Sequence, residues 1–108
     1  MELDNAKAQM RKGILELCIL STLKQNELYP SDIIKQLKKA GIVVAEGTIY
    51  PLLTRLKNAG LLSYRWQESM SGPPRKYYSI TTKGETVYNE LVVSWSELVN
   101  SVSKFINT

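Results

Sequence analysis

Residues 47–62 read GTIYPLLTRLKNAGLL, and this stretch decides the fold of the chain. Its apolar residues recur at three- and four-residue spacing, which predicts a helix that begins near Glu46. The run Asn58-Ala59-Gly60 supplies the glycine that commonly ends a helix. At about 100° per residue, the residues on the apolar face are Ile49, Leu52, Leu53 and Leu56. The stretch therefore predicts an amphipathic helix with a polar outer face.

The outer face of this predicted helix combines small polar groups with basic and aromatic edges. Such a surface can approach a DNA groove closely and offer hydrogen-bond donors to phosphates and base edges. The candidate DNA-contact residues on the helix are Thr48, Tyr50, Pro51, Thr54, Arg55 and Lys57. Two alternatives stay open: Tyr50 as a partly buried helix aromatic, and Arg55 and Lys57 as solvated charges.

Pro51 is the unusual residue of this helix, because proline deletes a backbone hydrogen bond and crowds the carbonyl group four residues earlier. Here that carbonyl group belongs to Gly47, whose backbone can adjust, and Pro51 follows directly on the first turn. Our hypothesis is that Pro51 shapes the way the helix enters a major groove.

Two helices are predicted before this stretch. The apolar residues between Lys7 and Lys24 predict one continuous helix with a wide buried face, which includes Met10. Pro30 and Ser31 are signals for a helix start, and the second helix ends near Gly41.

A β-hairpin and a last helix are predicted after it. LSYRWQ and RKYYSI are rich in aromatic and β-branched residues and flank the turn residues SMSGPP, which predicts a hairpin over 62–81 with a long tip. Thr82-Lys83-Gly84-Glu85 fits a capping box that opens the last helix. The fold class is thus mainly α with a small β-hairpin (α+β), a winged helix-turn-helix over residues 1–81 followed by a C-terminal helix over 82–108.

The last helix carries a signal for dimerisation. Leu91, Trp95, Leu98, Val102 and Phe105 alternate at spacings of four and three, and Val92, Val99 and Ile106 repeat every seven residues beside them. A chain of 108 residues leaves much of its surface exposed unless it pairs. We expect a homodimer in which this helix packs with the N-terminal helix; the alternative is that the stripe folds back on its own core.

Composition excludes several classes of function. The chain has no histidine and one cysteine, Cys18, so it lacks the usual general base, an intrachain disulfide and a plausible zinc site. We expect no catalytic site, metal or cofactor. The N-terminal residues are polar and no apolar run approaches about 18 residues, so we expect a cytoplasmic protein without a membrane partner.

Charge is distributed unevenly along the chain. Residues 1–83 hold 13 of the 14 Lys and Arg residues against 7 of the 10 acids, whereas residues 84–108 hold one lysine against three acids. The basic part is expected to face a polyanion. Arg75 and Lys76 follow the hairpin turn, where a winged helix reaches the sugar-phosphate backbone.

The whole pattern resembles the PadR-type bacterial transcriptional regulators. GTIYPLLTRLKNAGLL, PPRKYYSITTKGE, ILELCILSTL, DIIKQLK and the Ser94-Trp95 pair carry the resemblance, which covers nearly the whole chain. One departure is Pro30-Ser31, where many members have glycine followed by an aromatic residue. The resemblance implies DNA contacts by Thr48, Tyr50, Pro51, Arg55, Arg75 and Lys76.

The single helix after the hairpin is similar to the short subfamily, whose multidrug-responsive members bind flat aromatic compounds between two tryptophans. The resemblance places Trp95 at that tryptophan. The other implied ligand-binding residues are Val87, Leu91 and Val99 on the same helix and Met10, Gly13 and Leu17 on the first helix. The alternative is that Trp95 is plain interface core, and Glu16 and Glu97 are the nearest anions for a cationic ligand.

These features predict a homodimeric repressor of a pseudo-palindromic operator, with half-sites roughly one helical turn (~34 Å) apart. A planar aromatic effector would release it by changing the distance between the two recognition helices. Two alternatives stay open: a DNA-binding dimer without an effector, and a protein-interaction module that keeps the fold without specific DNA binding.

Overall fold

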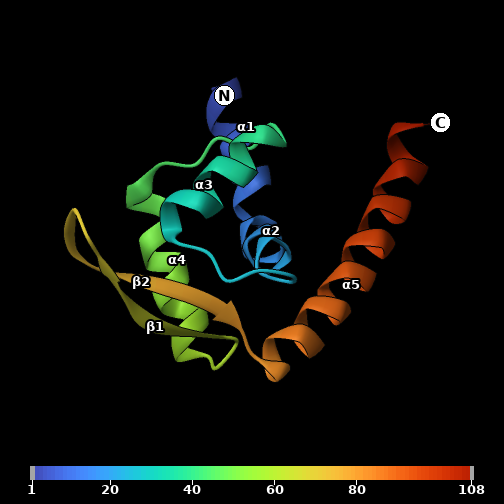
Figure 1. Ribbon diagram of the computed structural model, residues 1–108. Coiled ribbons are helices and arrows are strands. Elements are labelled where there is room, and N and C mark those ends of the chain that lie inside the picture. The colour runs from blue at the N-terminus through green and yellow to red at the C-terminus, as the bar shows by residue number, and fades with distance from the viewer. Residues whose placement is uncertain (1, 108) are drawn as a thin grey trace.

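The computed structural model describes residues 2–107. Its elements are α1 (Leu3–Lys12), α2 (Leu15–Thr22), α3 (Pro30–Lys39), α4 (Glu46–Asn58), β1 (Leu62–Ser69), β2 (Gly72–Ile80) and α5 (Thr82–Ile106). Helices α2, α3 and α4 form the body, the hairpin lies along α4 and α3, and α5 contacts α2 on the opposite side (Figure 1). The predicted α+β winged helix-turn-helix with a C-terminal helix is confirmed.

The hydrophobic core lies where α2, α3, α4 and the base of the hairpin meet. Its fully buried side chains are Ile19, Leu20, Leu23, Ile33, Ile49, Leu53 and Leu56. Cys18 is half-buried against this cluster, as expected for a small hydrophobic residue, and burial raises the pKa of its thiol. The predicted apolar face of residues 47–59 thus supplies a large share of the core.

The predicted continuous N-terminal helix is wrong: the chain breaks between α1 and α2. Gly13 ends α1, and the Ile14 amide donates to the Arg11 carbonyl at 3.0 Å, which closes a tight turn. Glycine is a poor helix former, so the break is cheap at this position. Because α2 takes its own direction, Leu15 is buried, whereas Met10, which was expected in the buried face, is 78% exposed.

The C-terminal end of α4 agrees with its glycine signal. Gly60 has φ +81°, a left-handed conformation that glycine adopts without strain. The Leu61 amide then donates to the Leu56 carbonyl at 3.0 Å, and the Gly60 amide donates to the Lys57 carbonyl. This paired capping arrangement turns the chain directly from α4 into β1.

The hairpin has a shorter tip than expected. Met70 and Ser71 alone separate the two strands, so Pro73 and Pro74 belong to β2 instead of a loop. Pro73 and Pro74 lie at the register shift between Gln67 and Ser69, an irregularity of the kind where strands accept proline. Antiparallel pairing places Tyr64 opposite Tyr78 and Trp66 opposite Lys76.

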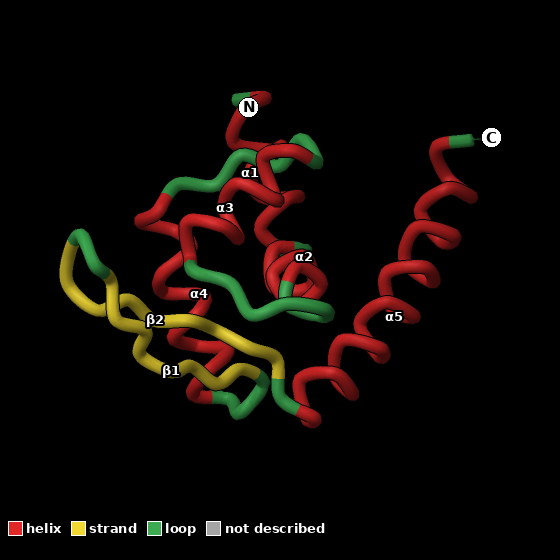
Figure 2. The backbone as a smooth tube through the Cα atoms, viewed as in Figure 1, coloured by secondary structure: helices red, strands yellow, loops and turns green. Residues whose placement is uncertain are grey.

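Helix α5 begins one residue earlier than the predicted capping box. Thr81 is the N-cap, and its Oγ1 accepts from the Gly84 amide at 3.0 Å and donates to the Gly60 carbonyl at 2.7 Å. Gly84 is buried and has no space for a side chain. A Cβ atom there would lie 2.7 Å from Cγ1 of Ile80 and closer still to the carbonyl oxygen of Leu61. The start of α5 is thus pressed against the end of α4, and the C-terminal part of α5 extends away from the body (Figure 2).

Candidate functional site

The outer face of α4 has the composition that the projection predicts. Ile49, Leu53 and Leu56 are buried and Leu52 is half-buried. The six predicted contact residues of this helix are all exposed: Thr48, Tyr50, Pro51, Thr54, Arg55 and Lys57. Tyr50 keeps 48% of its surface exposed, so only part of it fits the alternative of a packed helix aromatic.

The hairpin contributes a second surface next to this face. Tyr64, Trp66, Lys76 and Tyr78 lie on one face of the hairpin, because facing residues of antiparallel strands share a side. Tyr78 is buried in the core, Tyr64 is half-buried, and Trp66 is 61% exposed, so the face runs from the core out into solvent. Burial, followed by repulsion from Tyr64 and Tyr50, raises the pKa of Tyr78.

A depression of about 340 Å³ joins the two surfaces. Its lining residues are Pro30, Ser31, Tyr50, Thr54, Trp66, Pro74, Arg75, Lys76 and Tyr78. The structure thus brings together four predicted contact residues, Tyr50, Thr54, Arg75 and Lys76, from α4 and β2. Thr48 and Pro51 instead line a neighbouring depression with residues of α1, among them Arg11 and Lys12.

Three basic side chains of this surface are held by aromatic rings. Lys76 Nζ lies 4.5 Å from the ring centre of Tyr64, and Lys57 Nζ lies 5.8 Å from the same ring. Arg75 lies 4.1 Å from the ring centre of Tyr29, and its Nη2 donates to Ser31 Oγ at 2.9 Å. Within residues 2–107 none of the three pairs with a carboxylate. Their positive charge therefore stays available to an outside anion.

Arg55 differs from these residues because it forms an ion pair. Its guanidinium contacts the carboxylate of Glu16 on α2. The other described ion pair joins Arg65 to Glu27 at 3.0 Å. Arg65 also lies 4.9 Å from the ring centre of Tyr77, opposite it in the hairpin register and away from the face that carries Lys76.

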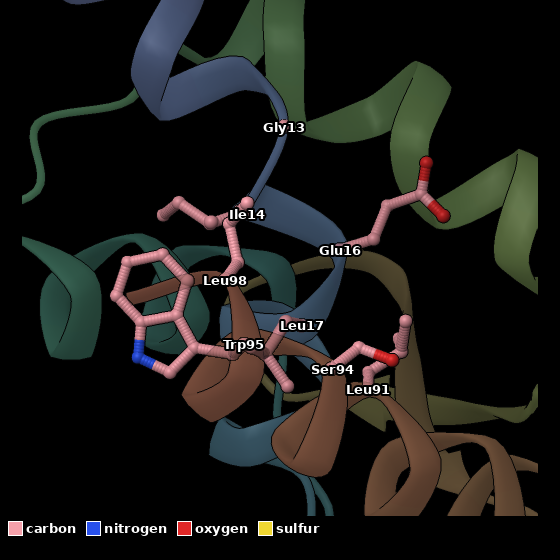
Figure 3. Close-up of a pocket in the computed structure, with 8 residues that line it drawn as sticks. All are labelled: Gly13, Ile14, Glu16, Leu17, Leu91, Ser94, Trp95 and Leu98. Carbon is pink, nitrogen blue, oxygen red and sulfur yellow. The ribbon is translucent and has the colours of Figure 1, made fainter. Parts of the chain in front are cut away.

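A second candidate site lies between the α1–α2 segment and α5. A depression of about 290 Å³ is lined by Gly13, Ile14, Glu16, Leu17, Leu91, Ser94, Trp95 and Leu98 (Figure 3). An adjoining one of about 590 Å³ is lined by Met10, Arg11, Gly13, Ile14, Trp95, Leu98, Val99, Val102, Ser103 and Ile106. Trp95 is common to both, and its indole reaches toward Ile14 in the close-up.

Six of the seven residues predicted for a ligand site line these depressions, and Val87 is the exception. Val87 is half-buried and packs against the hydrophobic core. Glu16, a candidate anion, extends its carboxylate away from the indole of Trp95 (Figure 3), and this carboxylate pairs with Arg55. Glu97 lines neither depression.

The described residues include no cluster of three or more histidine, cysteine, aspartate or glutamate side chains that could hold a metal ion. Among the same residues, no helix has the length and apolar character needed to cross a membrane.

Sequence reasoning did not identify three members of these sites: Ser31, Trp66 and the Glu16–Arg55 pair. The period-two pattern of the hairpin would have placed Trp66 beside Lys76, had the register been known. Ser31 and Glu16 reach their partners only through the packing of α3 against β2 and of α2 near α4. No local sequence signal reports such contacts.

Comparison with known proteins gives consistent results. The "Transcriptional regulator PadR-like family" matches the chain over residues 19–90. A PadR-like transcription factor from Bacteroides fragilis is 57% identical, over 94% of this chain and 98% of that one, with a TM-score of 0.79. A PadR family transcriptional regulator from Eggerthella lenta is 34% identical, over 98% and 93%, with a TM-score of 0.90. PadR of Bacillus subtilis, solved in complex with operator DNA, is 25% identical over 74% and 48%, with a TM-score of 0.70.

Proposed function

Because the chain belongs to the transcriptional regulator PadR-like family, we propose that it is a homodimeric repressor that binds a pseudo-palindromic operator through α4 and the hairpin. The family consists of transcriptional regulators, which confirms the expectation that the chain is not an enzyme. Its solved relative from Bacillus subtilis was crystallised with operator DNA, which supports DNA as the partner. A regulator of this kind works in the cytoplasm, where the bacterial chromosome lies.

The observation that carries the proposal is the shared depression of α4 and β2. Tyr50 and Thr54 offer hydroxyl groups from the outer face of α4, and Arg75 and Lys76 offer positive charge from the hairpin. In a winged helix-turn-helix the helix lies in the major groove and the hairpin reaches the adjacent backbone. Cations without carboxylate partners are the groups that phosphates of DNA attract.

The proposed dimer uses α5. Leu98, Val99 and Val102 are between 42% and 55% exposed, although they belong to the apolar stripe. Val87 and Leu91 pack against the core, whereas these three residues stay exposed, so the outer part of the stripe does not fold back onto the chain's own core. A second copy would remove this apolar surface from water, which is the main favourable contribution to such association.

The proposed effector is a planar aromatic compound that stacks on Trp95. The two depressions at Trp95 are lined mostly by apolar side chains of α5 and of the α1–α2 segment, which would meet across the dimer. A compound seated there would favour one separation of the two α4 helices over another. If the favoured separation differs from the spacing of the operator half-sites, operator affinity would fall, and the loss would grow with the strength of the compound's preference.

DNA binding is tested by fluorescence anisotropy. DNA from directly upstream of the chain's own gene is compared with scrambled DNA over a series of salt concentrations. We expect about 10³-fold tighter binding to the native sequence and a slope of log K against log salt of about −5 to −7. Equal affinity for both duplexes contradicts the repressor and favours the protein-interaction module.

A charge-removing variant sharpens this test. Arg75→Ala with Lys76→Ala removes four cations from a dimer, so the salt slope should become shallower by about 3 to 4. Lys104→Ala removes two cations from a dimer near the far end of α5, away from the hairpin, and as the control it should leave the slope unchanged. An unchanged slope in the double variant means that the hairpin does not contact phosphates.

The effector is tested separately, by quenching of tryptophan fluorescence with planar aromatic dyes. Trp66→Phe leaves Trp95 as the single emitter. Saturable quenching of Trp95 emission is the expected result, and Trp95→Ala should lower the dye affinity, measured through the fluorescence of the dye, while the dimer stays intact. Dye affinity that is unchanged in Trp95→Ala contradicts the stacking role and favours a dimer without this effector.

A further inference from the structure

Trp66 is a large aromatic residue that the fold leaves uncovered. It stands on the same hairpin face as Tyr78, which is buried, yet 61% of its own surface is exposed. Tyr64 meets its ring edge-on at a centroid distance of 6.0 Å, and Lys76 Nζ lies 5.6 Å from the ring centre. These contacts fix one side of the indole and leave its other side to solvent. Tryptophan is enriched at contact surfaces, so its exposure here points to a partner.

The position of Trp66 ties it to the proposed DNA surface. It lines the depression that Tyr50 and Thr54 of α4 share with Arg75 and Lys76. On its outer side it lines a second, shallow depression with Glu68, Pro73 and Pro74. Trp66 therefore lies between the basic part of the hairpin and an apolar patch nearer its tip.

The charges on the two sides of Trp66 indicate which part of DNA fits against its indole. Arg75 and Lys76 favour a phosphate on one side of the indole, whereas Glu68 repels a phosphate on the other side. Along one strand of DNA, the group next to a phosphate is a deoxyribose, whose ring presents an apolar edge in the minor groove. The indole and the two prolines form a matching apolar surface, and the stiff proline backbone loses little entropy on contact.

We propose that Trp66 is a DNA-contact residue whose indole packs against the deoxyribose edge of the minor groove, beside the major groove occupied by α4. The proposal rests on the proposed DNA binding and assigns a further role within it. The contact supplies affinity without reading a base, so it operates on any duplex that the hairpin grips.

The test uses Trp66 as its own reporter. Trp95→Phe leaves Trp66 as the single tryptophan, and a fluorescein-labelled duplex reports binding independently through its anisotropy. Because a sugar contact carries no sequence information, a generic duplex at low salt serves as well as the DNA upstream of the gene. We expect Trp66 emission to be quenched in proportion to the DNA bound.

Affinity measurements on variants complete the test. Trp66→Ala should weaken binding about 5- to 30-fold, in the range of an aromatic contact with a nucleotide, and Trp66→Phe should recover part of the loss. The salt slope of Trp66→Ala should equal that of the unmodified protein, since no cation is removed, in contrast to the variant without Arg75 and Lys76.

Three results would overturn the proposal. If anisotropy reports DNA binding while Trp66 emission and the affinity of Trp66→Ala are unchanged, the contact is absent and the DNA-binding function stands. If neither duplex binds, the DNA-binding function fails and the contact fails with it. If Trp66 emission changes with protein concentration alone, a second copy of the chain covers the indole instead of DNA.

Discussion

Replacing Glu16 by Gln is expected to strengthen DNA binding, although Glu16 lies on α2 and not on the proposed DNA surface. Its carboxylate pairs with the guanidinium of Arg55 on α4. In this pair the carboxylate offsets the charge that Arg55 would otherwise present to a phosphate. DNA binding therefore either weakens this ion pair or proceeds without the full attraction between Arg55 and a phosphate.

The size of the effect follows from the exposure of the pair. The side chain of Arg55 is 66% exposed and that of Glu16 is 33% exposed, so solvent screens the pair strongly. A pair of this kind contributes about 0.5 to 1 kcal/mol. Two such pairs in the proposed dimer give about 1 to 2 kcal/mol, which is about a 5- to 30-fold lower Kd for Glu16→Gln.

The assay is fluorescence anisotropy at fixed moderate salt, arranged as a double-mutant cycle with Arg55→Ala. Glu97→Gln on α5 makes the same change of net charge away from α4 and is the control; its effect should stay within about twofold. In the Arg55→Ala background, Glu16→Gln should act no more strongly than this control. An equal gain with and without Arg55, or no gain at all, refutes the reasoning.

Three further predictions concern the frame of the molecule. Pro51→Ala should raise the free energy of unfolding, because proline is unfavourable inside a helix, and should lower operator affinity in anisotropy titrations; a stabler protein with unchanged affinity and selectivity contradicts the role of Pro51. Gly84→Ala should lower the free energy of unfolding, measured with urea, by about 1 to 3 kcal/mol, because no space exists for its Cβ. Gly47→Ala, with open space around it, should raise this free energy by about 0.4 to 1 kcal/mol. Val99→Glu should yield a monomer in light scattering, whereas Val93→Glu, on the other side of α5, should leave the dimer intact; a dimer with both substitutions places the interface elsewhere.

The elements predicted correctly from the sequence are those with strong local signals. The bounds of α4 follow from apolar spacing and from a glycine whose left-handed conformation ends the helix. The exposed positions of Thr48, Tyr50 and Thr54 follow from the same periodicity. Local physics decides these features, so one sequence suffices to find them.

The features that were missed depend on contacts between distant segments or on competing local signals. A strong apolar period over Lys7 to Lys24 concealed the break at Gly13, which becomes visible only when α2 turns into the core. The tip of the hairpin was overestimated because Pro73 and Pro74 suggest a loop, although the register shift between the strands accommodates them. The pairing of Arg55 with Glu16 depends on the packing of α2 and α4, which the sequence does not encode at short range.

The close approach of Gly84 to Leu61 fixes the first turn of α5 to the end of α4, so the two helices move together. Helix α5 has 25 residues, so it is about 37 Å long. If α5 tilts by about 5° about its C-terminal end, which lies in the proposed dimer contact, its base moves by about 3 Å, close to the rise of one base pair, 3.4 Å. In the proposed dimer, a ligand that shifts α5 by a few degrees would thus displace α4 by one step along the operator. A bulkier residue at position 84 would loosen this joint, so that α5 would tilt without moving α4.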